Sequence, residues 1–137
     1  MRTKIICAAL VLLAPWSAHA ADYPVKFGEI KNGVVVSTRT LKMCAGKTGY
    51  VYGFEILLPE KGTHEVSGDL YWPPPPGATC VSCAHAMDSY GMHTGRYVKR
   101  LTFDLDDKPG DYSLTVVVDH DAVTTVKFKV VASTSCP

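Results

Sequence analysis

Residues 50–58 read Tyr-Val-Tyr-Gly-Phe-Glu-Ile-Leu-Leu, and this stretch decides the fold class. Every second position carries a large apolar or aromatic side chain: Tyr50, Tyr52, Phe54, Ile56 and Leu58. Successive side chains of a strand point to opposite sides, so a period of two places these five on one face. The stretch therefore predicts a β-strand with one buried face.

The same alternation recurs in further segments of the chain: 65–72, 97–105, 111–118 and 126–130. Near the start, Asn32-Gly33 lies between segments 25–31 and 34–39 and predicts a two-residue hairpin, because both positions favour positive φ. About seven strands and no helix of convincing length predict an all-β fold. We expect an immunoglobulin-like antiparallel β-sandwich, with a small barrel as the alternative. On the 97–105 strand, Leu105 is expected to share the buried face with Phe103.

The first twenty residues read as a secretory signal peptide. A basic start is followed by the apolar run 5–13, which is shorter than the roughly 20 residues that span a bilayer. Ala18-His19-Ala20 places small residues at both recognition positions of a cleavage site. We expect cleavage after Ala20, leaving residues 21–137 as one domain in the periplasm or outside the cell. An uncleaved membrane anchor is the alternative.

The overall charge and composition exclude two function classes. The full chain has 14 Lys and Arg against 13 Asp and Glu, which does not fit a simple electrostatic binder of nucleic acid. A hydrophobic fraction of 47% does not fit an acidic disordered chain. No second apolar run of spanning length follows the signal segment, so we expect no membrane span in the mature chain.

Four cysteines remain after cleavage: Cys44, Cys80, Cys83 and Cys136. An even number in an exported chain predicts two disulfides. Three pairings are possible. A longer closed loop restricts the unfolded chain more, which favours Cys44 pairing with Cys80 or Cys83 and Cys136 taking the other.

Residues 73–96 break the alternation. They open with four prolines, which lack amide donors and cannot continue a central strand. The segment predicts a long loop, tethered by its cysteines, that offers a contact surface on a rigid sandwich. Trp72, Tyr90 and Tyr97 surround it and are candidate binding residues, because tyrosine and tryptophan often dominate interfaces. In the alternative interpretation Trp72 and Tyr97 fill the core, and Tyr90 is the more exposed.

The same segment carries soft metal ligands. His85, Met87, Met92 and His93 follow the Cys-x-x-Cys pair, and imidazole, thioether and thiolate together suit copper or zinc. If the thiols are oxidised, the two histidines and two methionines would bind copper. No Gly-x-Ser-x-Gly turn or other complete catalytic motif occurs, so we do not expect an enzyme.

Short elements of the mature chain resemble an uncharacterised family of small bacterial exported domains with an immunoglobulin-like sandwich. The elements are Gly53-Phe54-Glu55-Ile56, Trp72-Pro73 to Pro76-Gly77, Phe103-Asp104-Leu105, Pro109 to Leu114 and Phe128-Lys129-Val130. The resemblance implies the fold and no catalytic residues. The sequence therefore predicts an exported binding domain that recognises an envelope or secreted protein through its 73–96 loop. A periplasmic copper- or zinc-binding protein is the alternative.

Overall fold

The computed structural model describes residues 22–44, 50–79 and 84–135. The predicted signal peptide lies outside these ranges and stays a prediction. Nine strands are described: β1 (Val25–Lys31), β2 (Val34–Ser37), β3 (Thr40–Cys44), β4 (Val51–Leu57), β5 (His64–Tyr71), β6 (His85–His93), β7 (Arg96–Thr102), β8 (Gly110–Val118) and β9 (Asp121–Ser133). Within these ranges no helix is long and apolar enough to cross a membrane.

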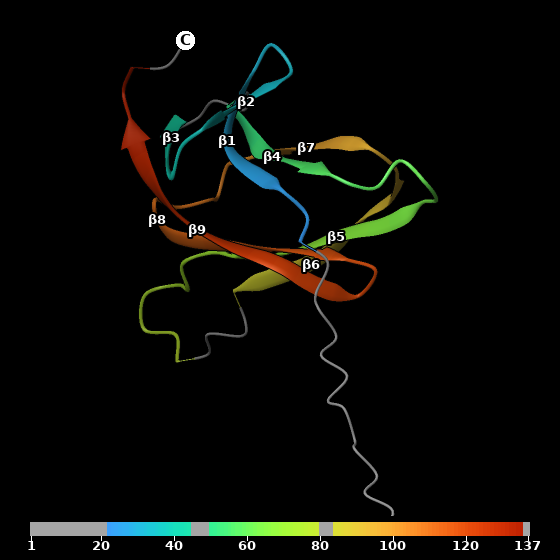
Figure 1. Ribbon diagram of the computed structural model, residues 1–137. Helices are drawn as coiled ribbons and strands as arrows, with labels where there is room; N and C mark the ends of the chain where they lie inside the picture. The colour runs from blue at the N-terminus through green and yellow to red at the C-terminus, as the bar shows by residue number, and fades with distance from the viewer. Residues whose placement is uncertain (1–21, 45–49, 80–83, 136–137) are drawn as a thin grey trace, which may run out of the picture.

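The strands form two sheets that stack as a sandwich, as the alternation predicts (Figure 1). One sheet has the order β2-β1-β4-β7, and the other has the order β3-β9-β8-β5-β6. The pairing differs from the prediction at one place. β3 runs parallel to β9, whereas the other described pairs are antiparallel. The larger sheet is therefore mixed.

The core lies between the sheets and is built by the predicted faces. Tyr52, Phe54, Ile56 and Leu58 are buried, and so are the alternating residues of β8 and β9. Five rings from both sheets form an aromatic cluster: Phe27, Tyr52, Phe103, Tyr112 and Phe128. Ring centroids lie 4.6 Å apart for Tyr52 and Phe103 and 4.7 Å apart for Phe27 and Phe128. Each such pair adds about 1 kcal/mol beyond its buried area.

Two hairpin turns have positive φ at both of their central positions. Asn32 and Gly33 have φ of 51° and 77°, and Lys31 pairs with Val34, so the predicted two-residue turn is confirmed. Asp119 and His120 have φ of 49° and 69° and join β8 to β9 in the same way. Positive φ at both central positions matches the twist of the strands that flank such a turn.

Two strands were not predicted, and one is β3. Its residues Leu41 and Met43 point inward and are 0% and 8% exposed, but two apolar positions are too few to show a period. Pairing with the end of β9 stabilises the strand. The sequence contains no local signal for that partner, because it comes from the opposite end of the chain.

The other unpredicted strand is β6, and it corrects the predicted loop. The 73–96 segment is not a single loop, because His85–His93 pairs with β5 as an edge strand. Met87 and Met92 are 63% and 58% exposed, so the strand shows no apolar alternation, and its backbone pairing with β5 and the packing of Tyr90 on Phe54 hold it. A register irregularity between Glu65 and Ser67 of β5 further disturbs the alternation. Leu105, expected in the core, is 76% exposed. It lies in the turn in which the Asp107 amide donates to the Asp104 carbonyl.

Gly28 and Gly53 mark a close approach of neighbouring strands. They face each other across β1 and β4. A β-carbon at Gly28 would collide with the backbone carbonyl of Val36, and one at Gly53 with that of Lys99. Backbone atoms cannot move aside as a flexible side chain can. These two positions of the smaller sheet therefore need glycine for space.

We expect Gly28→Ala to lower the free energy of unfolding by about 2 kcal/mol or more, because the added methyl overpacks fixed backbone. Gly62→Ala is the matched control, since Gly62 has φ of 80° but nothing within 4 Å of its added carbon. Its cost should be about 1 kcal/mol from backbone strain alone. Urea denaturation measures both, and an equal loss in the two variants would contradict the close approach.

Cys80, Cys83 and Cys136 lie outside the described residues, so both disulfides and their pairing stay predictions. Cys44 ends β3 and faces Ser133 of β9 in the parallel pair.

We expect peptide mapping of the unreduced, exported protein to recover two disulfides, one joining Cys44 to Cys80 or Cys83 and the other containing Cys136, because longer closed loops restrict the unfolded chain more. The same digest after reduction is the control. A peptide that links Cys44 to Cys136 would contradict this expectation.

Candidate functional site

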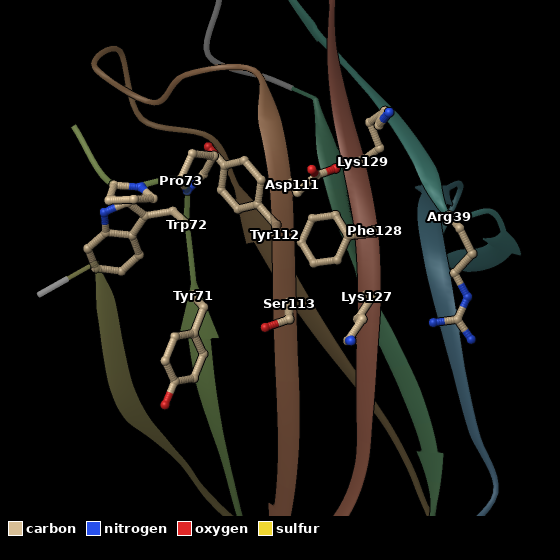
Figure 2. Close-up of a pocket in the computed structure, with 11 residues that line it drawn as sticks. Arg39, Tyr71, Trp72, Pro73, Asp111, Tyr112, Ser113, Lys127, Phe128 and Lys129 are labelled. Carbon is tan, nitrogen blue, oxygen red and sulfur yellow. The ribbon is translucent and has the colours of Figure 1, made fainter. Parts of the chain in front are cut away.

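A shallow groove of about 620 Å³ lies on the larger sheet (Figure 2). We call it the cation–proline groove. Its lining residues come from β5, β8, β9 and the segments next to β3 and β5: Arg39, Tyr71, Trp72, Pro73, Pro74, Asp111, Tyr112, Ser113, Lys127, Phe128 and Lys129. The groove is open to solvent, so a bound molecule would lie across the strands rather than inside the sandwich.

The buried core fixes which side chains reach the groove. Tyr112 and Phe128 point into the aromatic cluster and are 5% and 4% exposed. Their neighbours along each strand must point the other way, because strand side chains alternate. Ser113 lies opposite both Tyr71 and Lys127 in the pairing register. Three strands therefore present polar side chains in one row across the outer face of the sheet.

One side of the groove is cationic. Arg39, Lys127 and Lys129 are exposed. The Lys129 amide donates to the Arg39 carbonyl at 2.8 Å, which keeps these two residues adjacent. Across the described ranges, no carboxylate forms an ion pair with any of the three. Asp111 is the acidic lining residue, so the lining carries a net charge of +2.

The other side is aromatic and proline-rich. Figure 2 shows Trp72 and Pro73 across the sheet from Arg39 and the two lysines. The Trp72 amide donates to the Ala84 carbonyl at 2.9 Å, which anchors the start of the proline run. Proline fixes its own φ, so Pro73 and Pro74 form a wall with little backbone freedom to lose on binding.

Tyr71, at the base of this wall, is fixed by two neighbours. Its ring stacks on His85 with centroids 4.7 Å apart and an interplanar angle of 11°. His85 Nδ1 in turn lies 2.8 Å from Oδ1 of Asp69, whose side chain is only 14% exposed. The hydrogen bond of the Tyr71 hydroxyl to Asp69, together with the negative charge of that carboxylate, raises the pKa of Tyr71. This chain of contacts holds the ring in place before any ligand arrives.

Of the three aromatic residues predicted to bind, Trp72 alone lines the groove. Tyr90 is not the most exposed of them: its ring packs on Phe54, with centroids 6.1 Å apart, and burial raises its pKa to about 12. Lys99 Nζ lies 4.3 Å from the centroid of the same ring. Tyr97 packs edge-on against Phe54, and burial raises its pKa as well. Tyr90 and Tyr97 therefore close the gap between the sheets.

The structure does not bring the predicted copper ligands together. His85, Met87, Met92 and His93 lie along β6, and its two ends are about 26 Å apart at the usual rise of an extended strand. His85 is paired with Asp69, and His93 donates from Nε2 to the Tyr90 carbonyl at 2.6 Å. The His93 ring also stacks on Tyr97, with centroids 3.5 Å apart. One ion cannot contact both histidines, so a copper site built from these four residues is not formed. Cys80 and Cys83 lie outside the described residues.

Sequence reasoning missed the cationic side of the groove. The alternation already places Lys127 and Lys129 opposite the buried side of β9, so their outward direction was predictable. Their meeting with Arg39 and with the proline run depends on long-range strand pairing. A single sequence contains no signal for that pairing.

A second polar cluster joins β5 to the β8–β9 hairpin. His64 donates from Nδ1 to Oδ2 of Asp119 at 2.7 Å, and the Glu65 amide donates to the other oxygen at 3.0 Å. The His64 hydrogen bond is the main reason that the pKa of Asp119 is lowered. His120, at the tip, lies 3.6 Å from a Glu65 oxygen and is largely exposed. These contacts cap the hairpin, so we assign the cluster a structural role.

The comparisons with known proteins identify the fold. No protein-family model matches the chain, and no curated protein matches its sequence. The fold is similar to an immunoglobulin-like protein from Pseudomonas aeruginosa, with a TM-score of 0.50 and 16% identity over 78% of this chain and 91% of that one. It is also similar to part of an alkylpurine DNA glycosylase from Pseudomonas fluorescens, solved bound to DNA with an abasic site analogue. That likeness has a TM-score of 0.50 and 12% identity, and it covers 80% of this chain but 30% of the glycosylase.

At these identities both likenesses concern the fold alone. The chain has an immunoglobulin-like β-sandwich, and the predicted fold class is confirmed. Membership of an exported bacterial family stays a prediction.

We expect Asp69→Asn to lower the pKa of Tyr71 toward the ordinary 10.0, because a neutral amide no longer disfavours the phenolate. The titration of the Tyr71 ring carbon next to the hydroxyl, followed by NMR, measures this change. Asp111→Asn removes a carboxylate from the same groove without touching Tyr71 and is the control. An unchanged midpoint in Asp69→Asn would refute the proposed restraint on the ring.

Proposed function

We propose that this chain is an exported, non-catalytic binding domain that recognises a protein of the cell envelope or a secreted protein through the cation–proline groove. Export rests on the signal-peptide features of residues 1–20. The immunoglobulin-like sandwich is a rigid platform that suits this role, because binding surfaces are commonly carried on such scaffolds.

The observation that carries the proposal is the set of unpaired cations beside an aromatic and proline wall. An exposed lysine by itself is ordinary, since its charge is well hydrated. Here Arg39, Lys127 and Lys129 gather on β9 and beside β3, and among the described residues Asp111 offsets only one of their three charges, with no ion pair to any of them. Mutual repulsion of like charges opposes such a cluster unless a partner supplies the opposite charge.

The contact surface differs from the one that the sequence suggested. The proline run still contributes, through Pro73 and Pro74. Residues 85–93 belong to an edge strand, so they extend the sheet rather than form a flap. The proposed surface is therefore the face of the sheet together with the first part of the β5–β6 connection.

We expect the double variant Lys127→Glu, Lys129→Glu to lose about tenfold or more of its capture of an envelope or secreted partner, which corresponds to about 1.4 kcal/mol. The full exported protein, immobilised and challenged with envelope extract and culture fluid, is the assay. Lys26→Glu with Lys61→Glu is the charge-matched control, because both lysines are exposed and neither lines the groove.

Two results would contradict the proposal. One is equal capture of the same partners by wild type and the groove variant. The other is an equal loss in the groove variant and its control, which would show a dependence on net charge alone. Near-ultraviolet circular dichroism of each variant verifies that the fold survives.

A further inference from the structure

We infer that the groove takes an extended peptide segment whose acidic end lies over Arg39, Lys127 and Lys129 and whose apolar end lies against Trp72, Pro73 and Pro74. This inference rests on the proposed function and specifies its ligand.

The charged and the apolar residues of the groove lie on opposite sides of it. Cations lie on the β9 and β3 side, and the aromatic and proline wall lies beyond β5 (Figure 2). A ligand that satisfies both sides must carry negative charge at one end and an apolar surface at the other. The middle, on β8, is formed by Asp111 and Ser113.

The middle of the groove distinguishes a peptide from an acidic polysaccharide. A polymer with a charge on every unit would place an anion over Asp111 and further anions over the apolar wall, and both positions are unfavourable. A peptide can confine its carboxylates to one end. Its backbone amides can then donate to the Asp111 carboxylate and its carbonyls can accept from the Ser113 hydroxyl, which are the groups that an extended chain presents along its length.

The dimensions also fit a short extended segment. Strands of a sheet are about 4.8 Å apart, so the path from β3 across β9 and β8 to β5 is about 14 Å. About four extended residues cover that distance. Tyr71, held by His85 and Asp69, lies at the point where the path reaches the wall. Little of the groove would need to reorganise on binding, because its wall and Tyr71 are already fixed.

The test uses three fluorescent probes with the full exported protein. The first is a synthetic peptide with a Glu-rich half followed by a half of Pro, Leu and Trp. The second has the same composition with acidic and apolar residues interleaved. The third is a polygalacturonate oligomer. Fluorescence anisotropy at low and at physiological salt measures affinity, because attraction between exposed charges weakens as salt rises.

We expect the segregated peptide to bind about tenfold or more tightly than the interleaved one, and its affinity to fall with salt. The variant Lys127→Glu, Lys129→Glu should lose about tenfold or more, whereas Lys26→Glu with Lys61→Glu should bind as wild type does. Equal affinity for the two peptides would overturn the inference.

Three further results would each contradict the inference. Polygalacturonate binding that is stronger than peptide binding and is lost in the groove variant would show that the groove takes an acidic glycan, which overturns the inference. If neither peptide binds while the groove variant still loses its captured partner, the inference fails and the proposed function stands. If the groove variant keeps its partner as well, the proposed function fails with it.

Discussion

The aromatic cluster between the sheets is the contact on which the rest of the structure depends. Tyr112 and Phe128 stack with their centroids 5.5 Å apart, and Phe128 contacts Phe27 and Tyr52 of the opposite sheet. Because these rings point inward, the residues beside them on β8 and β9 must point outward. Packing inside the sandwich thus determines which side chains form the groove outside it. A change in the register of β9 would bury its lysines and expose Phe128.

Much of the fold could be predicted from local patterns, and the rest depends on partners distant in sequence. The faces of β4, β8 and β9 and the Asn32-Gly33 turn follow from alternation and from turn chemistry. β3 has two inward residues, and β6 is an edge strand with exposed methionines, so neither shows a period that a sequence window detects. The candidate site, too, has a part that local sequence patterns predict and a part that depends on distant strand pairing. Trp72 and the prolines were visible in the sequence, whereas their juxtaposition with Arg39 depends on the order of strands in the sheet.

The edge of the smaller sheet shows how the protein limits unwanted pairing. β7 is an edge strand that carries Arg96, Lys99 and Arg100 along seven residues. Charged side chains discourage another strand from adding to such an edge. Two of these cations already have local partners, since Arg96 contacts Glu55 at 2.6 Å and Lys99 lies over the Tyr90 ring. The groove cations on the other sheet lack such partners among the described residues, which distinguishes a protective charge from one available for binding.

The position of β9 in the larger sheet has a consequence for the order of folding. β9 is the last of the described strands, yet it separates β3 from β8. β3 therefore has no neighbour in its own sheet until β9 has been made and has joined the sheet. Contacts between such distant segments form slowly, because bringing the two segments together costs conformational entropy of the chain between them. Loss of β9 would thus disrupt β3 as well, and a chain in which β9 has not yet paired would expose Leu41 and Met43.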